Sequence, residues 1–105
     1  MERHRIAIII PALNESGTIA EIVTGAARYG VPIVVDDGSR DDTGARSAAA
    51  GAEVVTHASN RGYDQAINSG FAHASTLGCE YVLTLDADGQ HEPEILESFV
   101  RALDD

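Results

Sequence analysis

The stretch YVLTLDADGQHEPE, Tyr81–Glu94, sets a short apolar run against two aspartates one residue apart. The run Tyr81–Leu85 has the length and composition of a strand that is buried on both faces. It ends at Asp86 and Asp88, and two carboxylates at the end of a buried strand are costly unless a positive partner neutralises them. Pro93 stands where the first residue of a helix is expected. The stretch therefore predicts a strand, a polar loop and a helix.

The same unit precedes this stretch three times. Earlier strands are predicted at Arg5–Ile10, Val31–Val35 and Glu53–Thr56, and apolar residues at helical spacing follow each of them. Thr18 and Glu21 have the spacing of a capping box at the start of the first helix, and Asp41 is a candidate N-cap of the second. Nearly continuous apolar strands alternating with helices predict an α/β fold, Rossmann-like, with a parallel sheet between two helical layers. With the strand order 3-2-1-4, a ligand would bind beyond the carboxyl ends of the strands, where the order reverses.

Composition narrows the classes of function. The chain of 105 residues is 44% hydrophobic and has a formal net charge of −10, with seven arginines and no lysine. Such a charge argues against non-specific nucleic-acid binding and would repel an anionic ligand unless a divalent cation accompanied it. No apolar run approaches the ~20 residues of a membrane span. The single Cys79 excludes an internal disulfide and fits a reducing, cytoplasmic setting.

Polar residues follow all four predicted strands and should meet at one rim of the sheet. Five of them are carboxylates, namely Glu15, Asp36, Asp37, Asp86 and Asp88. Crowded carboxylates and the nearby Gln90 carbonyl suit Mg²⁺ or Mn²⁺, which commonly takes its remaining ligands from water and phosphate. The pattern therefore favours a metal-bound nucleoside diphosphate as the ligand.

Simpler interpretations exist for each motif. Asp86 and Asp88 could be turn residues before a helix, and Asp36-Asp37-Gly38-Ser39 could be a turn followed by an N-cap. Neither G-x-G-x-x-G nor a P-loop is present. Four histidines remain. His4 and His57 are expected at the surface or in loops and His73 on a helix, without a functional role, whereas His91 could contact phosphate.

Four segments resemble, in order, the signatures of family 2 inverting glycosyltransferases with a GT-A fold. They are IIIPALNES, IVVDDGSRDDT, NRGYDQAINSGF and VLTLDADGQH. The last is similar to the dolichol-phosphate mannosyltransferase-like branch, which includes polyprenyl-phosphate glycosyltransferases. The resemblance implies a GDP- or UDP-linked sugar donor, Mg²⁺ or Mn²⁺, and a lipid-phosphate acceptor. It assigns the donor to Pro11, Ala12, Glu15, Asp36, Asp37, Arg61, Gly62 and Asp86, and the metal to Asp86, Asp88 and Gln90.

Two departures from the family pattern shape the remaining expectations. Asp64 and Gln65 replace the usual small pair after the N-x-G-Y signature, which adds charge near the donor. The family's domain also runs on by about a hundred residues that carry the acceptor site and the catalytic base. We therefore expect residues 1–105 to be the nucleotide-sugar-binding half of a GT-A domain, with no catalytic base identified and little transfer activity alone.

Further expectations concern the protein's setting. An uncovered sheet edge favours a homo-oligomer. We expect a cytoplasmic location, peripheral to the membrane in a longer parent protein. The alternative function is a non-catalytic nucleotide-binding or scaffold module. A sugar nucleotidyltransferase fits less well, because PALNES is not the Gly-rich, basic loop which that class carries after its first strand.

Overall fold

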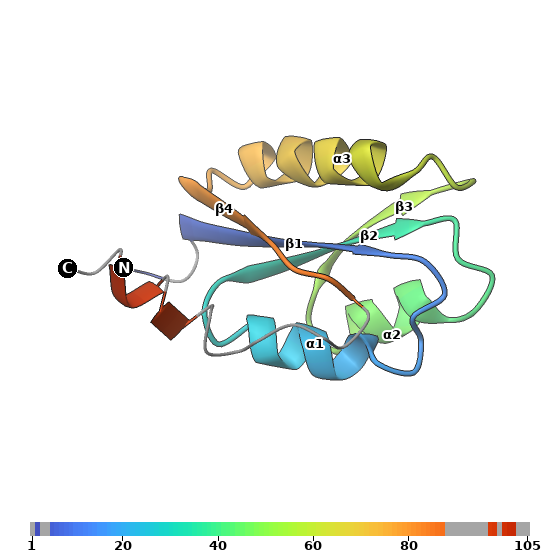
Figure 1. The fold of residues 1–105 in the computed structure, drawn as a ribbon, viewed down its shortest axis with the longest axis horizontal. Coiled ribbons are helices and arrows are strands. Elements are labelled where there is room, and N and C mark those ends of the chain that lie inside the picture. Colours follow the sequence, from blue (N-terminus) through green and yellow to red (C-terminus); the bar gives the residue numbers. More distant parts are fainter. Residues whose placement is uncertain (1, 3–4, 88–96, 99, 103–105) are drawn as a thin grey trace.

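Four parallel strands form the sheet of the protein, shown in Figure 1. The computed structural model describes residues 2, 5–87, 97–98 and 100–102. The strands are β1 (Ile6–Ala12), β2 (Val31–Asp37), β3 (Glu53–His57) and β4 (Tyr81–Thr84). Their order is β3-β2-β1-β4, and every neighbouring pair is parallel. The predicted fold class and strand order are therefore confirmed.

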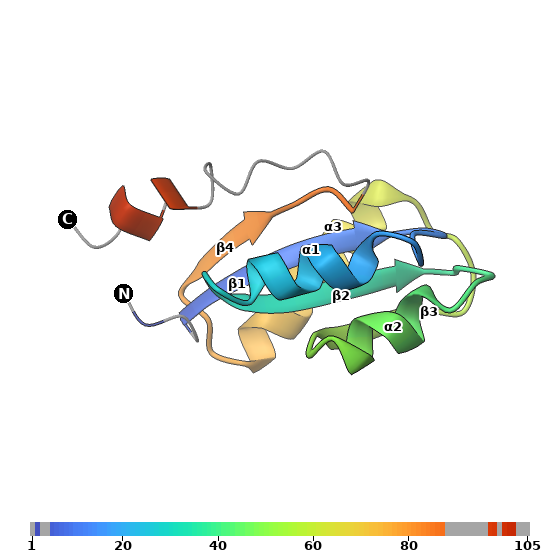
Figure 2. The same ribbon diagram turned by 90° about the horizontal axis from the view of Figure 1, so that it is seen from below.

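Helices cover both faces of the sheet. Helix α3 (Tyr63–Thr76) lies on one face, while α1 (Ile19–Ala26) and α2 (Thr43–Ala49) share the other, as the two views in Figures 1 and 2 show. This arrangement gives three layers, with the sheet in the middle. Both faces of the central strands are thereby shielded from water, which explains why their sequences are almost uninterruptedly apolar.

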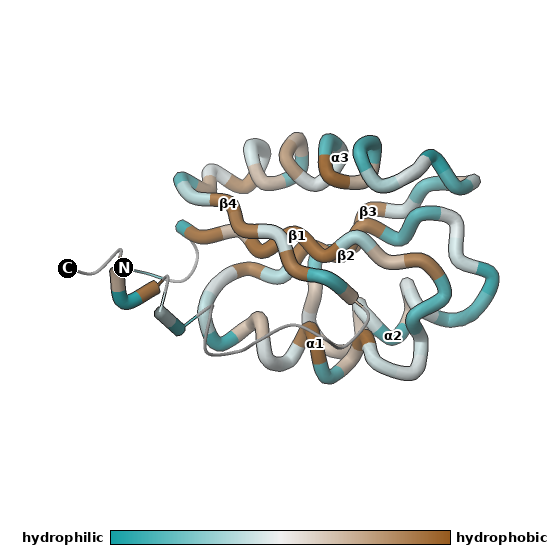
Figure 3. The backbone as a smooth tube through the Cα atoms, in the orientation of Figure 1, coloured by the Kyte–Doolittle hydropathy of each residue, from teal (hydrophilic) through white to brown (hydrophobic). Residues whose placement is uncertain are grey.

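Strand β1 is the centre of the core. Ile6, Ile8 and Ile10 pack toward α1, whereas Ala7 and Ile9 belong to the clusters beneath α3. All five are fully buried. Figure 3 shows the resulting brown band along the central strands and the hydrophilic colour on the loops at the right-hand end. The buried polar residues of the strands are Asp36, Asp37 and His57, which stand at the carboxyl ends of β2 and β3.

All four strands differ from the sequence prediction by one or two residues at an end; β2 continues to Asp37 and β4 stops at Thr84. Strand β1 does not stop at Pro11 but continues to Ala12, paired with β2. Proline is tolerated there because β4 pairs with β1 only as far as Ile9 opposite Thr84, so no ladder bond on that side needs its missing N–H. Strand β3 extends to His57, which pairs with Asp37 at the end of β2.

The predicted helix caps are confirmed only in part. Thr18 is the N-cap residue of α1, but its side chain makes no capping bond, and the N-cap of α2 is Asp42, not Asp41. The side chains of Thr18 and Asp41 instead make hydrogen bonds to other segments of the chain, as described below.

Near the C-terminus, Val100 lies in a helical segment and packs against the α1 side of the core. Within the described residues, no helix is both long and apolar enough to span a membrane.

Candidate functional site

The loops that follow β1, β2 and β3 gather at the right-hand end of the domain in Figure 1. Parallel strands place their carboxyl ends at one edge of a sheet, so polar residues far apart in the sequence become neighbours there. We call these segments loop 1 (residues 13–18), loop 2 (residues 38–42) and loop 3 (residues 58–62). The segment after β4 reaches the same region at Asp86.

Loops 1 and 2 are joined directly by hydrogen bonds. The Asn14 amide donates to the Ser39 hydroxyl at 2.9 Å, and the Arg40 amide donates back to Asn14 Oδ1 at 2.8 Å. Asn14 adopts a φ of 56°, a left-handed conformation that asparagine tolerates better than most residues. The two loops therefore form one unit, and the side chain of Asn14 is committed to it.

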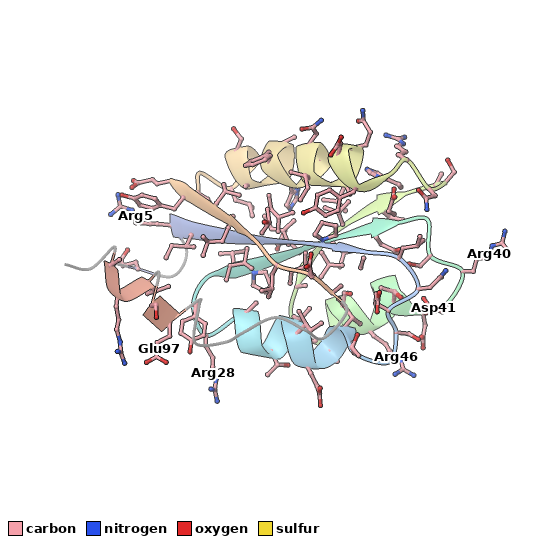
Figure 4. The ribbon with its side chains drawn as sticks, in the orientation of Figure 1. Arg5, Arg28, Arg40, Asp41, Arg46 and Glu97 are labelled. Carbon is pink, nitrogen blue, oxygen red and sulfur yellow. The ribbon has the colours of Figure 1, made fainter. Side chains whose placement is uncertain are left out.

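Thr43 strengthens the same junction from the first turn of α2. Its buried hydroxyl accepts the Glu15 amide at 2.9 Å and donates to the Asp41 carboxylate. Asp41 also accepts the amides of Ser16 and Thr43. The Thr43 hydroxyl, helped by these amides, lowers the pKa of Asp41 to about 2. Asp41 thus belongs to the framework that holds Glu15 in place, and Figure 4 shows it beside Arg46 at the edge of the domain.

Asp37 organises loop 3 in a comparable way. Its carboxylate accepts the backbone amides of Arg61 at 2.8 Å and Gly62 at 2.9 Å, and lies 2.7 Å from His57 Nδ1. Burial pushes the pKa of Asp37 upward, but the hydrogen bonds from Arg61, His57 and Gly62 outweigh it, so this pKa lies below its usual value. The carboxylate therefore stays ionised at neutral pH.

The expectation that His57 lies at the surface or in a loop is wrong. His57 is the last residue of β3 and is only 4% exposed. Its two ring nitrogens contact Asp37 and the Ser69 hydroxyl. Strand alternation could have revealed this position, because Val55 and His57 share a face and Val55 packs toward α3. His73 lies on α3, as predicted, and its Nε2 is 3.0 Å from Glu53 Oε1.

Asp36 points to the other face of the sheet. Its Oδ1 accepts the Ser39 amide at 3.0 Å, and its Oδ2 lies close to Gly44 in α2. The side chain is buried, as is that of Asp37. Adjacent residues of a strand face opposite sides, so the two carboxylates of the Asp36-Asp37 pair serve different layers.

The segment after β4 is anchored at two points. The Leu85 amide donates to the Ile9 carbonyl at 2.9 Å, and the Thr18 hydroxyl donates to the Ala87 carbonyl at 2.9 Å. Asp86 lies between these anchors and faces the loops. Asp88, Gln90, His91 and His4 lie outside the described residues.

A cleft of about 400 Å³ opens where these segments meet. Six of the eight predicted donor-binding residues line it, namely Pro11, Ala12, Glu15, Asp37, Gly62 and Asp86. The other two do not: Asp36 faces α2, and Arg61 contributes its amide to Asp37. The residues that complete the lining were not among the predicted donor-binding residues; they are Leu13, Asn60, Tyr63, Ala66 and Ala87.

The cleft is acidic. Three of its lining residues are the carboxylates Glu15, Asp37 and Asp86, and no arginine of the described chain lines it. The arginines labelled in Figure 4 project outward from the edges of the domain. No three His, Cys, Asp or Glu side chains form a metal-binding group within the described ranges, which stop short of Asp88. Asp86 alone of the predicted metal ligands can be placed, and its oxygens are of the hard type that Mg²⁺ and Mn²⁺ prefer.

Comparison with protein families gives one match that spans almost the whole chain. The model of the family described as glycosyl transferase family 2 matches residues 7–105. The matched region therefore contains β2, β3, β4, all of β1 except its first residue, the three cleft carboxylates and the Asp86-Ala87-Asp88 segment.

Curated relatives are considerably longer than this chain. The uncharacterized protein MJ1222 of Methanocaldococcus jannaschii is 34% identical over 103 residues, which cover 96% of this chain and 42% of that protein. The undecaprenyl-phosphate 4-deoxy-4-formamido-L-arabinose transferase of Sodalis glossinidius is 35% identical over 114 aligned residues, covering 95% of this chain and 34% of the transferase. The chain thus spans about two fifths or less of these relatives.

Solved structures share the fold. Glucosyl-3-phosphoglycerate synthase from Mycobacterium tuberculosis, crystallised with Mn²⁺, UDP and glucosyl-3-phosphoglycerate, superposes with a TM-score of 0.71 at 27% sequence identity. The superposition covers 95% of this chain and 39% of the synthase. A crystal structure of the same enzyme with Mn²⁺, UDP-glucose and phosphoglyceric acid gives a TM-score of 0.67 at 26% identity.

Proposed function

Because this chain belongs to glycosyl transferase family 2, we propose that its cleft binds the nucleoside diphosphate of a sugar donor together with a divalent cation. Residues 1–105 would be the donor-binding half of a GT-A glycosyltransferase. The observation that carries the proposal is the convergence of Pro11, Glu15, Asp37 and Asp86, from three separate strand ends, on one cleft. A volume of about 400 Å³ lies within the range of small-molecule sites.

Electrostatics supports the presence of the cation. A nucleoside diphosphate carries negative charge, and the cleft presents three carboxylates within a chain of net charge −10. Mg²⁺ or Mn²⁺ would be held by Asp86, with Asp88 and Gln90 as further ligands. A bound cation of this kind would screen the diphosphate from the carboxylates and stabilise the charge that develops on it as a leaving group.

Five of the described residues that line the cleft are assigned tasks in this proposal. Pro11, Ala12 and Glu15 would form the floor and wall against which the nucleoside lies. Asp37, held ionised by two backbone amides, can accept a hydrogen bond from a base N–H or a ribose hydroxyl. Gly62 is the N-cap residue of α3 and makes no side-chain capping bond, which leaves room for a ligand to approach the positive end of the helix.

An acceptor for the transferred sugar is proposed only for the full-length protein. The relative from Sodalis glossinidius is named as a transferase that acts on undecaprenyl phosphate. By this similarity, the full-length protein would transfer a sugar to a polyprenyl phosphate, at the cytoplasmic face of the membrane. The described chain would contribute donor binding and orientation to that reaction.

Thermal unfolding in the presence of nucleotides tests the proposal. UDP or GDP at a hundred times its Kd should stabilise the chain by about 2.7 kcal/mol, and only when Mn²⁺ is present. Asp86→Asn and Asp88→Asn should remove the shift. Asp42→Asn is the matched control, because Asp42 stands before α2 without a side-chain capping bond and pairs with the exposed Arg46 outside the cleft. If no nucleotide shifts the midpoint with Mn²⁺, the cleft is not a donor site.

A further inference from the structure

A chain of three polar side chains runs from helix α3 to the cleft. The Ser69 hydroxyl lies 2.8 Å from His57 Nε2, and His57 Nδ1 lies 2.7 Å from Asp37 Oδ1. His57 and Asp37 are 4% and 5% exposed, respectively, and they are register partners at the ends of β3 and β2. Only the last member of this chain, Asp37, lines the cleft.

The direction of the hydrogen bonds follows from their chemistry. An ionised carboxylate can only accept, so His57 Nδ1 must carry a proton and donate it to Asp37. The other ring nitrogen then either accepts the Ser69 hydroxyl proton or, when the ring is charged, donates to that hydroxyl. Ser69 therefore satisfies the ring in both protonation states and prevents it from rotating away from Asp37.

The restrained carboxylate in turn holds loop 3. Asp37 Oδ1 accepts from His57 and from the Arg61 amide, and Oδ2 accepts from the Gly62 amide. The next residue after this pair is Tyr63, which lines the cleft with Gly62. Removing the donor at His57 would free the carboxylate to turn, and both loop amides would lose their fixed acceptor.

We propose that His57 and Ser69 are positioning residues that fix the Asp37 carboxylate and the Arg61–Gly62 backbone in the geometry that receives the donor nucleotide. Neither side chain lines the cleft, so each acts through Asp37. A histidine with a purely structural role would also need a hydrogen-bond partner for each ring nitrogen. His57 differs because one of its partners, Asp37, lines the cleft. The inference rests on the proposed function only for the identity of the ligand. The hydrogen bonds that hold loop 3 are present in the ligand-free protein.

Two measurements distinguish the hold of His57 on loop 3 from nucleotide binding by the cleft. The first is hydrogen exchange at the Arg61 and Gly62 amides in the ligand-free protein, which reports the hold on loop 3 directly. The second is UDP and GDP affinity in the presence of Mn²⁺, measured by calorimetry at a temperature where circular dichroism shows every variant folded. The variants are His57→Phe, which fills the space without a donor, and His57→Asn, whose amide can replace Nδ1–H. His73→Asn is the matched control, since His73 pairs with Glu53 at the surface.

His57→Phe should raise exchange at both amides and weaken nucleotide binding, each by about tenfold, as expected for loss of one buried hydrogen bond to a charged group. His57→Asn should recover most of both effects, and His73→Asn should change neither. Ser69→Ala should give a smaller change of about threefold in the same direction, and it decides the question if His57→Phe does not fold.

Unchanged exchange and affinity in folded His57→Phe or, if that variant does not fold, in Ser69→Ala would overturn the inference. Faster exchange in His57→Phe without recovery in His57→Asn would also overturn it, because packing rather than the donated hydrogen bond would then be responsible. If the wild type binds no nucleotide, the proposed function fails, and the exchange measurement alone decides whether His57 positions loop 3.

Discussion

Replacement of Gly70 by alanine should push helix α3 away from the sheet. A methyl group at this position would lie 2.5 Å from Ile9 Cγ2 and 3.0 Å from Cδ1 and Cγ1. Ile9 is fully buried on the central strand, and close-packed interiors leave little space for it to turn. Ala66, which lines the cleft, lies one turn earlier on α3. The displacement would therefore reach the cleft as well as the core.

The free energy of unfolding should fall by about 1–2 kcal/mol. Overpacking a core costs about 1–3 kcal/mol, and the gain in helix propensity from glycine to alanine returns up to about 1 kcal/mol. Gly25→Ala is the matched control, because nothing lies within 4 Å of a methyl group added at this position in α1. That control should be neutral or stabilising by up to about 1 kcal/mol.

A double-mutant cycle isolates the contact. Ile9→Ala removes all three atoms that the new methyl group would meet, at a cost of about 2–5 kcal/mol by itself. The Ile9→Ala/Gly70→Ala protein should be more stable than the sum of the single changes predicts, by about 1 kcal/mol or more. Urea unfolding followed by circular dichroism, with an unchanged m value, provides each free energy. An additive cycle, or a Gly70→Ala protein as stable as Gly25→Ala, would refute the close approach of α3.

Three further predictions concern the loops. Thr43→Val should lower the free energy of unfolding by about 1–3 kcal/mol, because it leaves the Glu15 amide without its acceptor. NMR titration of the same variant should show a higher pKa for Asp41 than in the wild type. Thr24→Val, at an exposed position of α1, is the control. Asp37 and Asp41 both have lowered pKa values in the folded protein. Their contribution to stability should therefore be full above about pH 4 and fall as the pH drops toward 2. A free energy of unfolding that stays constant between pH 5 and 2 would contradict this. Thr18→Val should weaken the hold on Ala87 and speed proteolysis after β4, and unchanged cleavage would count against it.

Much of the fold could be predicted because its signal is local. The apolar runs of β1 and β2 can only be buried on both faces, and helical periods between them require parallel strands. Helix starts were less predictable, since Thr18 has the local sequence of a cap but donates to Ala87, 69 residues away. Asp41 likewise accepts the Ser16 amide from another loop. A local pattern cannot reveal a partner that only the folded chain brings near.

The site was predictable where its residues follow a strand directly. Glu15, Asp37 and Asp86 each line the cleft because a parallel sheet delivers its carboxyl ends to one rim. Tyr63 and Ala66 were missed because they come from the first turn of α3, whose approach to the rim depends on packing against β1. His57 was missed because a polar residue at a strand end was assigned to the loop, although strand alternation places it inward.

The paired aspartates at the end of β2 show how one short motif can organise two layers. Asp36 accepts the Ser39 amide on the α2 side, where loop 2 is also joined to loop 1. Asp37 accepts two amides of loop 3 on the α3 side. Because strand alternation forces the two side chains apart, neither can take over the role of the other. Loss of Asp36 should therefore loosen the wall formed by loops 1 and 2, whereas loss of Asp37 should loosen loop 3, and only the second removes a carboxylate from the cleft itself.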